Sequence, residues 1–271
     1  MGYKNRVLFT EPFICDNSKS RISPLVSIIT PCYNAVETII KTIDSVLYQT
    51  YQNWEMIIVD DCSSDASLLI IDDYAKKDSR IKYYKTEAPS GSPAIPRNIG
   101  IEKSHGQYIA FLDSDDIWLP SKLERQMSYV ETSNCDLLYS YYEKINWDGH
   151  RNGRVIKPRK WVTYCNLLQT NVIPMLTAIV RRDVIGNVRF KQIAQEDYCF
   201  WLDIMKKGYK AECLQSVTAL YRESKNSRSS NKIKTINGQW CVLRNHQNVP
   251  FIPSCFYMFT YAVAGMIKHF K

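Results

Sequence analysis

The sequence predicts an α/β fold with a mainly parallel central sheet, and two observations carry this prediction. Short apolar runs alternate with helical patterns through the first half of the chain, which is typical of β-α-β units. Polar or acidic residues directly follow three of the apolar runs, at 31–34, 60–61 and 113–116. Because parallel sheets bind ligands at the carboxyl ends of their strands, these segments predict one binding cleft.

The first half of the chain contains four runs that are expected to be strands, at 26–30, 54–59, 81–85 and 108–113. Polar residues able to cap a helix follow the first two. Asn34, with Glu37 three residues later, has the spacing of a capping box. Ser63 to Asp65 can cap the second helix, and a third, short helix is expected to begin at Arg97.

The second half is less regular. After a helix at 122–131, strands are expected at 136–145, 178–182 and 210–214, with a turn at 146–153 and a basic, irregular stretch at 154–164. A helix at 196–206 ends before Gly208. The expected organisation is a leader at 1–24, one α/β domain at 25–220, a mobile basic loop at 221–250 and an apolar C-terminal segment at 251–271.

Composition narrows the class of protein. The net charge is +8, which fits an anionic partner such as a nucleic acid, a membrane surface or a phosphorylated substrate, and equally fits a basic solvated surface. The nine cysteines are scattered and form no Cys-x-x-Cys pair, so neither a zinc site nor a disulfide framework is expected. The N-terminus lacks the pattern of a secretion signal, and no clean apolar stretch of membrane-spanning length occurs.

The acidic run that ends the fourth expected strand is the strongest chemical signal. Asp113, Asp115 and Asp116 lie within four residues directly after an apolar run. Carboxylates this close repel one another, so either solvent or a divalent cation should offset their charge. An Asp-x-Asp pair suits Mn²⁺ or Mg²⁺, which take few protein carboxylates and prefer phosphate oxygens for the remaining positions. The alternative is a solvated acidic turn before the next helix.

Five segments, in the order in which they occur, resemble the motifs of family 2 glycosyltransferases. They are the first strand Val26 to Asn34, the acidic segment Ile58 to Asp65, Arg97-Asn98-Ile99-Gly100, Asp113-Ser114-Asp115, and Gln195-Glu196-Asp197-Tyr198 followed by Trp201-Leu202. The resemblance covers about residues 25–220 and implies the GT-A (Rossmann-like) fold. Within this family, the sequence resembles in particular the bacterial enzymes that build O-antigen and other surface polysaccharides.

The resemblance also implies roles for individual residues. Those expected at the nucleotide are Pro31 and Tyr33 lining the base pocket, Asp61 at the uracil edge, Arg97 nearby and Asp113 facing the ribose. Asp115 would bind the metal that bridges the diphosphate. Asp197 would be the base that deprotonates the acceptor hydroxyl, with Glu196 beside it. A single base without a nucleophile implies inversion, so an α-linked donor would give a β-linked product.

Several of these residues also have a purely structural interpretation. Asp60 can cap a helix, Asp197 can be a first-turn acid favoured by the helix dipole, and Tyr33 can be a packed aromatic. Trp201 fits the core better than a sugar platform. In the family a Tyr-Arg pair such as Tyr221-Arg222 introduces a mobile loop that closes over the diphosphate, which gives Arg222 a phosphate-binding role. The alternative is a solvated basic loop.

Residues 251–267 are apolar and aromatic but short for a membrane span, which favours an interfacial helix at a membrane surface over a span. The alternative is a helix docked on the domain's own core. If the segment binds membrane, the acceptor would be a lipid-linked saccharide, as for relatives that extend a sugar on undecaprenyl diphosphate.

The sequence thus predicts a metal-dependent inverting glycosyltransferase. It would move glucose or galactose from a UDP-hexose to a terminal N-acetylglucosamine (GlcNAc), as a peripheral protein at the cytoplasmic face of a bacterial inner membrane. Rival functions are transfer to lipopolysaccharide core or protein, and non-catalytic binding of nucleotide sugar or carbohydrate. RNA binding is disfavoured, because no aromatic stacking motif is recognisable, so no nucleic-acid partner is expected.

Overall fold

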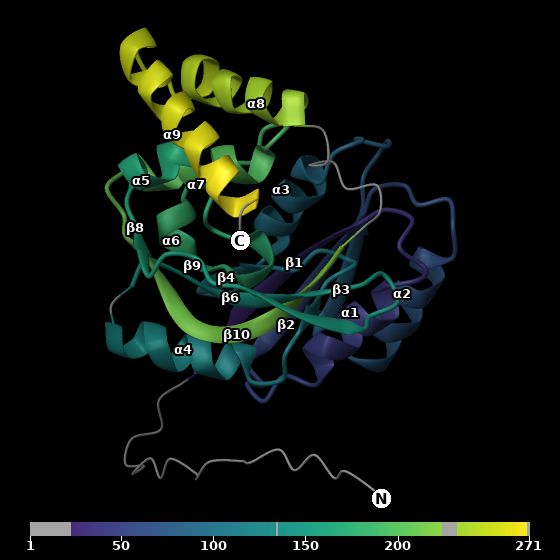
Figure 1. Ribbon diagram of the computed structural model, residues 1–271. Coiled ribbons are helices and arrows are strands. Elements are labelled where there is room, and N and C mark those ends of the chain that lie inside the picture. Colours follow the sequence, from purple (N-terminus) through teal and green to yellow (C-terminus); the bar gives the residue numbers. More distant parts are fainter. Residues whose placement is uncertain (1–22, 134, 224–231, 270–271) are drawn as a thin grey trace, which may run out of the picture.

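A mixed sheet forms the centre of the protein, and helices lie against both of its faces (Figure 1). The computed structural model describes residues 23–133, 135–223 and 232–269. Its strands are β1 (Val26–Cys32), β2 (Trp54–Asp60), β3 (Ile81–Lys85), β4 (Tyr108–Phe111), β5 (Ile117–Trp118), β6 (Leu137–Ile145), β7 (Arg151–Ile156), β8 (Trp161–Val162), β9 (Ile179–Arg181) and β10 (Ala211–Arg222).

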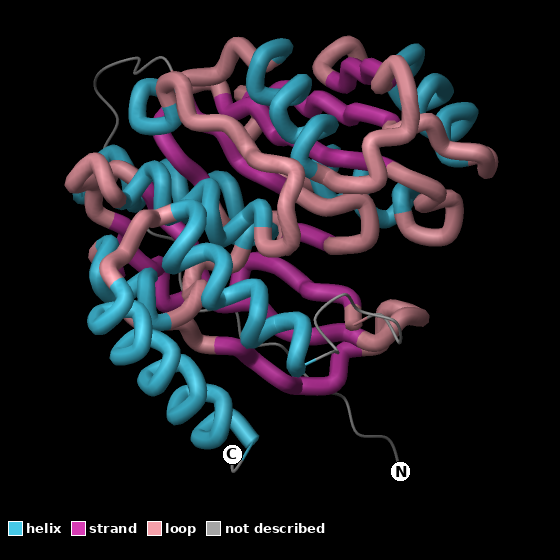
Figure 2. Tube along the Cα trace, turned by 90° about the horizontal axis from the view of Figure 1, so that it is seen from above, coloured by secondary structure: helices cyan, strands magenta, loops and turns pink. Residues whose placement is uncertain are grey.

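The helices follow the strands in the alternation that the sequence predicts. They are α1 (Ile39–Leu47), α2 (Ser67–Lys77), α3 (Ala94–Lys103), α4 (Lys122–Ser133), α5 (Tyr164–Gln169), the 3₁₀ turn η1 (Met175–Thr177), α6 (Arg182–Ile185), α7 (Glu196–Met205), α8 (Lys232–Cys241), the π-helical turn η3 (Val242–His246) and α9 (Phe251–His269). Figure 2 shows α9 running along the outside of the molecule, away from the sheet.

The strand order is β3-β2-β1-β4-β9-β6-β10-β5, with β7 paired to β6 and β8 paired to β10. The first four positions are parallel, as are β6 and β10, whereas β9, β5, β7 and β8 pair antiparallel to their neighbours. The expected α/β architecture with a parallel core is therefore confirmed, and antiparallel strands extend the sheet beyond β4.

Two apolar cores, one on each face, hold the sheet between the helices. All seven residues of β1 are buried, and its successive side chains point to opposite faces, so Ile28 joins one core and Ile29 the other. The first core is completed by α1, α2 and α4, and the second by α3, α5 and α7. This burial on both faces explains why β1 has a nearly continuous apolar sequence.

Some expected helix boundaries are wrong. Helix α1 begins at Ile39 rather than at Asn34, which has a left-handed backbone (φ 48°) and accepts a hydrogen bond on its side-chain oxygen from the Ser64 amide at 2.8 Å. Asn34 therefore ties the turn after β1 to the turn after β2 instead of capping a helix. Helix α3 begins at Ala94, which places Arg97 inside the helix.

The C-terminal boundaries also differ from expectation. The expected strand at 210–214 is part of the longer β10, which runs to Arg222, and the expected irregular stretch at 154–164 contains the end of β7 and all of β8. The loop expected at 221–250 is wrong for its described part, because α8 and η3 are helical and Leu243 is buried. Residues 224–231 of that expected loop, and residues 1–22 of the leader, lie outside the described residues.

Candidate active site

The carboxyl ends of β1, β2 and β4 lie side by side, as the sequence predicts. Strand β1 is parallel to both β2 and β4, and the Asp61 amide donates to the Cys32 carbonyl at 2.8 Å. The polar segments 31–34, 60–61 and 113–116 therefore meet at one edge of the sheet. In open α/β sheets this edge is where ligands bind.

Asp61 lies at the end of β2 and is buried, with an exposed fraction of 5%. Its carboxylate accepts hydrogen bonds from the Thr86 hydroxyl at 2.9 Å, from the Ser90 hydroxyl at 2.9 Å and from the Ser90 and Gly91 amides. The carboxylate therefore fixes the loop between β3 and α3 against the end of β2. These contacts hold that loop at the binding edge of the sheet.

Asp60, one residue earlier, is fully buried. One of its carboxylate oxygens accepts a hydrogen bond from the Ser63 amide at 3.2 Å, while the other is buried without a partner among the described residues. Because α2 begins at Ser67 after Ala66, the suggestion that Asp60 caps this helix is wrong. Asp60 shapes the turn after β2.

Arg97 joins the acidic turn to the carboxylate pair at the start of α7. Its guanidinium is buried and pairs with Asp113 at 2.7 Å and with Glu196 at 3.2 Å, and it lies over the Phe190 ring, 5.3 Å from the centroid. Asn98 holds the same segment, because its side chain exchanges hydrogen bonds of 2.9 and 2.8 Å with the Phe190 backbone. Arg97 thus brings together acids that lie far apart in the sequence.

Asp115 and Asp116 follow Asp113 in the acidic turn. Burial and the neighbouring Asp113 raise the pKa of Asp115 to about 6. Asp116 is fully buried, which raises the pKa of its carboxyl well above the ordinary value, and it accepts a hydrogen bond from the Arg222 amide at 2.9 Å. Ionisation of these carboxyls is therefore unfavourable in this poorly solvated turn. A bound cation would offset the negative charge, so the turn favours binding of a cation.

Arg222 is a second arginine that contacts this turn, and it lies at the end of a strand. It ends β10, is 2% exposed, and donates from Nε to the Asp115 carbonyl at 2.7 Å and from a terminal nitrogen to the Trp147 carbonyl. Arg222 therefore belongs to a strand and not to the loop expected at 221–250, while residues 224–231 lie outside the described residues and the expected role of Arg222 at the diphosphate stays a prediction. Arg222 instead ties the acidic turn to the hairpin between β6 and β7, and its second terminal nitrogen is buried without a partner among the described residues.

Asp197 lies beside Glu196 in the first turn of α7. Burial raises the pKa of both carboxyls, while the charge of Arg97 opposes that rise. The Asn171 side chain donates to one Asp197 oxygen at 3.0 Å, and a hydrogen bond with the Tyr198 backbone also lowers the pKa of this carboxyl. Nothing in the sequence marked Asn171, because it lies 26 positions away in an irregular stretch.

The remaining expected residues differ in their surroundings. Pro31 is buried in β1, whereas Tyr33 is 59% exposed, so the suggestion that Tyr33 is a packed aromatic is wrong. Trp201 is completely buried against Phe111, with ring centroids 6.0 Å apart, which confirms that it belongs to the core rather than to a sugar platform.

A cation fits the donor set of the acidic turn only with help from a substrate. Within the described ranges, no cluster of three or more His, Cys, Asp or Glu side chains is arranged as a complete metal site. Asp113 already accepts from Arg97, while Asp115 has a raised pKa and, among the described residues, no side-chain ion pair. One such carboxylate plus diphosphate oxygens is a donor set that Mg²⁺ and Mn²⁺ accept.

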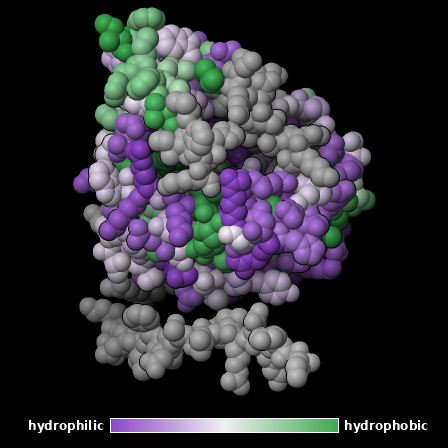
Figure 3. All heavy atoms as spheres, in the orientation of Figure 1, coloured by the Kyte–Doolittle hydropathy of each residue, from purple (hydrophilic) through white to green (hydrophobic). Residues whose placement is uncertain are grey.

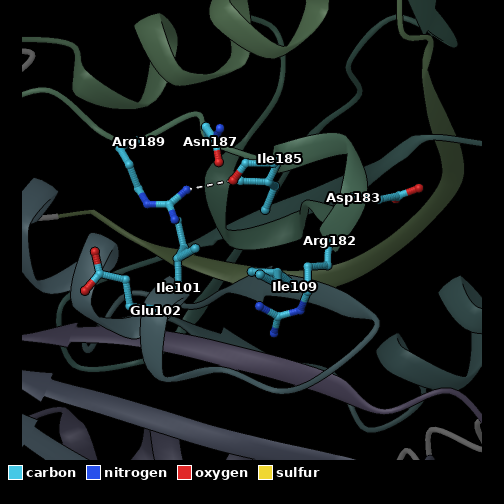
Figure 4. Close-up of a pocket in the computed structure, with 9 residues that line it drawn as sticks. Ile101, Glu102, Ile109, Arg182, Asp183, Ile185, Asn187 and Arg189 are labelled. Atoms are coloured by element: carbon cyan, nitrogen blue, oxygen red, sulfur yellow. Dashed lines mark hydrogen bonds between the residues drawn. The ribbon is translucent and has the colours of Figure 1, made fainter.

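A separate concavity lies away from these residues. It has a volume of about 460 Å³ between α3, β4 and α6, and Figure 4 shows Arg182 and Arg189 at its wall. Arg182 donates to the Gly106 carbonyl at 2.6 Å, and Arg189 donates to the Gly186 carbonyl at 2.8 Å. The residues that line it include none of the expected site residues.

Three acidic features meet at one edge of the parallel sheet: a buried aspartate after β2, an acidic turn after β4 and a carboxylate pair on α7. Together they define an α/β enzyme of the GT-A type. The chain belongs to glycosyltransferase family 2, because the model of the family described as "Glycosyl transferase family 2" matches residues 27–186. The protein is therefore a glycosyltransferase, as the sequence motifs indicated.

Two curated relatives match over nearly their whole length. The "Putative teichuronic acid biosynthesis glycosyltransferase TuaG" of Bacillus subtilis is 38% identical over 246 residues, which are 90% of this chain and 97% of the relative. The "UDP-Glc:alpha-D-GlcNAc-diphosphoundecaprenol beta-1,3-glucosyltransferase WfgD" of Escherichia coli is 40% identical over 246 residues, which are 90% of this chain and 95% of the relative.

Solved structures share the fold at low sequence identity. TarS 1-349 of S. aureus, solved in complex with UDP, superimposes with a TM-score of 0.66 and 21% identity, over 88% of this chain and 70% of that chain. The mannosyltransferase PcManGT of Pyrobaculum calidifontis, solved with GDP-Man and Mn²⁺, gives a TM-score of 0.64 and 15% identity, over 89% of this chain and 74% of that chain.

Proposed function

We propose that this protein is an inverting, metal-dependent hexosyltransferase that acts in the synthesis of a surface polysaccharide. The donor would be a UDP-hexose, glucose before galactose, and the acceptor a GlcNAc unit on undecaprenyl diphosphate, joined through a β-linkage. Support for the substrates comes from WfgD and from WfaP of Escherichia coli, which has the same printed activity and is 38% identical over 250 residues. Support for the chemistry comes from one observation, the convergence of Asp113, Glu196 and Asp197 around buried Arg97.

The donor would bind along the sheet edge. Pro31 and Tyr33 would line the base, Asp61 would accept from the uracil edge, and Asp113, held by Arg97, would face the ribose. Asp115 would hold Mn²⁺ or Mg²⁺, and such an ion, when bound, offsets the charge that grows on the leaving diphosphate. Arg222 contributes from the protein side, because its guanidinium fixes the backbone of Asp115 and adds positive charge beneath the turn.

The acceptor would react from the side of α7. Its hydroxyl oxygen attacks the anomeric carbon of the hexose, the bond to the UDP oxygen breaks, UDP leaves with the bonding electrons, and the hydroxyl proton passes to Asp197. Asn171 would orient Asp197, and Arg97 would hold Glu196 beside it. The raised pKa of Asp197 suits this role, since a base closer to neutral pH takes a proton more readily than an ordinary aspartate.

The proposed acceptor supports a proposal for where the enzyme works. An undecaprenyl chain is buried in a bilayer, so a protein that elongates its headgroup must work at the membrane surface. The nucleotide-sugar donor is available at the cytoplasmic face of that membrane. We therefore propose a peripheral protein at the inner membrane. Over the described residues, no helix has both the length and the apolar character needed to cross a bilayer.

The test is transfer from a panel of UDP-, GDP- and dTDP-sugars to a synthetic GlcNAc-diphosphate-lipid, with Mn²⁺ or with EDTA. We expect metal-dependent UDP release and a β-linked product, both lost in Asp115→Ala and Asp197→Ala. UDP binding without turnover on this acceptor would redirect the search to lipopolysaccharide core, protein or teichuronic acid acceptors. Absence of any nucleotide binding would overturn the proposal.

A further inference from the structure

The C-terminal helix α9 has two different faces. One face packs against the domain, where Ser254 is fully buried and Tyr257 and Met258 contact the apolar core. The other side exposes large apolar side chains, with exposed fractions of 61, 81, 60 and 68% for Phe251, Ile252, Phe256 and Phe259. Because Ile252, Phe256 and Phe259 follow the i, i+4, i+7 spacing, they form a single outward stripe.

Helix α8 extends this apolar surface. Ile236 on α8 is 46% exposed, and the Trp240 ring meets the Phe251 ring edge-on, with centroids 5.8 Å apart. Arg244, in η3 just after α8, lies over the Phe251 ring at 6.0 Å from the ring centroid. Figure 3 shows the corresponding apolar region at the upper left of the molecule, over α8 and α9. We call the exposed side chains of 236, 251, 252, 256 and 259 the α8–α9 surface.

The charge of the protein is concentrated in the same part of the sequence. Glu223 is the last acidic residue. Seven of the 35 basic residues and none of the 27 acidic residues follow it, so residues 1–223 carry 28 basic and 27 acidic side chains and are nearly neutral. Within the described range 232–269, the basic residues are Lys232, Lys234, Arg244 and Lys268, without an acid.

We propose that the α8–α9 surface docks on an anionic lipid bilayer. Exposed phenylalanine and isoleucine, in a part of the chain whose sequence has lysine and arginine but no carboxylate, match the composition of a helix that lies in the headgroup region. A self-complementary dimer through this surface would bring two positively charged segments together, which electrostatics disfavours. A nucleic acid would satisfy the charge but would leave the aliphatic and phenylalanine stripe without a partner.

Helix α8 of the docking surface contacts residues that lie next to the proposed acceptor base, Asp197. Gly238 of α8 lies so near to Gln195 that a Cβ at this position would meet its side-chain nitrogen at 3.0 Å. Gln239 donates to the Leu168 carbonyl and the Tyr198 hydroxyl, both at 3.1 Å. Residues 195 and 198 flank the carboxylate pair of α7, so a bilayer against α8 and α9 would lie next to the side from which the acceptor approaches. This inference deepens the proposed function by assigning the membrane contact to named residues.

The experiment measures binding of the full chain to vesicles of phosphatidylglycerol with phosphatidylcholine, and to vesicles of phosphatidylcholine alone. We expect binding to the anionic vesicles that weakens with salt, and a fall of roughly tenfold or more in the partition coefficient for the double variant Phe256→Ser, Phe259→Ser. Leu69→Ser is the matched control, because Leu69 is 74% exposed on α2, at the other end of the sheet (Figure 1), and should leave binding unchanged. Equal unfolding midpoints would show that the variants fold.

Two results would overturn the docking surface: no vesicle binding by the parent chain, or equal binding by the parent and the double variant. A concentration-dependent dimer that the double variant loses, without vesicle binding, would assign the surface to a second copy. Sugar transfer to a water-soluble, short-chain acceptor separates this inference from the proposed function. Transfer without vesicle binding would reject only the surface, and vesicle binding without transfer to either acceptor would reject only the function.

Discussion

Replacing Asp115 by asparagine should stabilise the protein while it abolishes activity. The Asp115 carboxyl is largely buried and lies near Asp113, and this burial together with the neighbouring charge raises its pKa from about 3.8 to about 6. The amide of Asp115→Asn has nearly the same shape but carries no charge. The substitution therefore removes a repulsion that the folded protein tolerates in order to bind a cation.

The size and the pH dependence of this effect follow from the shift. A rise of about 2 pKa units corresponds to up to ~3 kcal/mol between the protonated and ionised forms. Because the folded state binds this proton more tightly than the unfolded state, the favourable contribution is complete below about pH 3.8 and is lost as the pH rises through about 6. Asp115→Asn does not titrate, so its advantage should be largest above pH 7 and small near pH 4.

Urea unfolding in EDTA, at pH 4 and at pH 8, measures the two free energies of unfolding. Asp73→Asn is the control, since Asp73 is 58% exposed on α2 and its neutralisation should change stability by less than ~0.5 kcal/mol. Addition of Mn²⁺ and UDP should stabilise the parent protein and not Asp115→Asn. A variant that is less stable than the parent at pH 8, or equally favoured at both pH values, would refute this account of the acidic turn.

Three further predictions test other contacts. Arg97→Gln leaves two carboxylates near the core unpaired, and urea unfolding should show a loss of about 3–5 kcal/mol; a loss below ~1 kcal/mol would contradict a structural ion pair. Gly106→Ala places a Cβ 2.6 Å from the Leu25 carbonyl oxygen, which is backbone and cannot rotate away, so the midpoint of urea unfolding should fall by an amount equivalent to about 1–3 kcal/mol; an unchanged midpoint would contradict the close approach. Asn171→Ala removes a hydrogen bond that lowers the pKa of Asp197, so the acid limb of the kcat/KM–pH profile should move to higher pH; an unmoved limb would show that Asp197 is not the base.

The strands and the binding edge were predictable because their signals are local. The run from Val26 to Thr30 is apolar at every position but two, and the structure buries all of β1 between two helical layers. The acids after β2 and β4 are adjacent to their strands in the sequence, so parallel pairing alone brings Asp61 and Asp113 to the same edge. No long-range information is needed for either inference.

The helix starts and the C-terminal region were less predictable. The Asn34 and Glu37 spacing fits a capping box, but the amide oxygen of Asn34 instead accepts a hydrogen bond from Ser64, a partner 30 residues away. The polar composition around Ile236 suggested a loop, yet this segment is helical and Gly238 fits closely against Gln195. In both cases a tertiary contact decides between local conformations of similar energy.

The sequence by itself determined the α/β class, the family motifs in their order and the carboxylates at the strand ends, because periodicity and adjacency are written along the chain. Only the tertiary structure decided that Arg97 pairs both with Asp113 and, across 99 positions, with Glu196, that Arg222 ends a strand beneath the acidic turn, and that α9 leaves one apolar face uncovered. The physical reason is that burial and pairing depend on which surfaces meet. Burial and pairing in turn determine the pKa of each carboxyl and the exposure of each apolar side chain. The pKa and the exposure are therefore not properties of a residue alone.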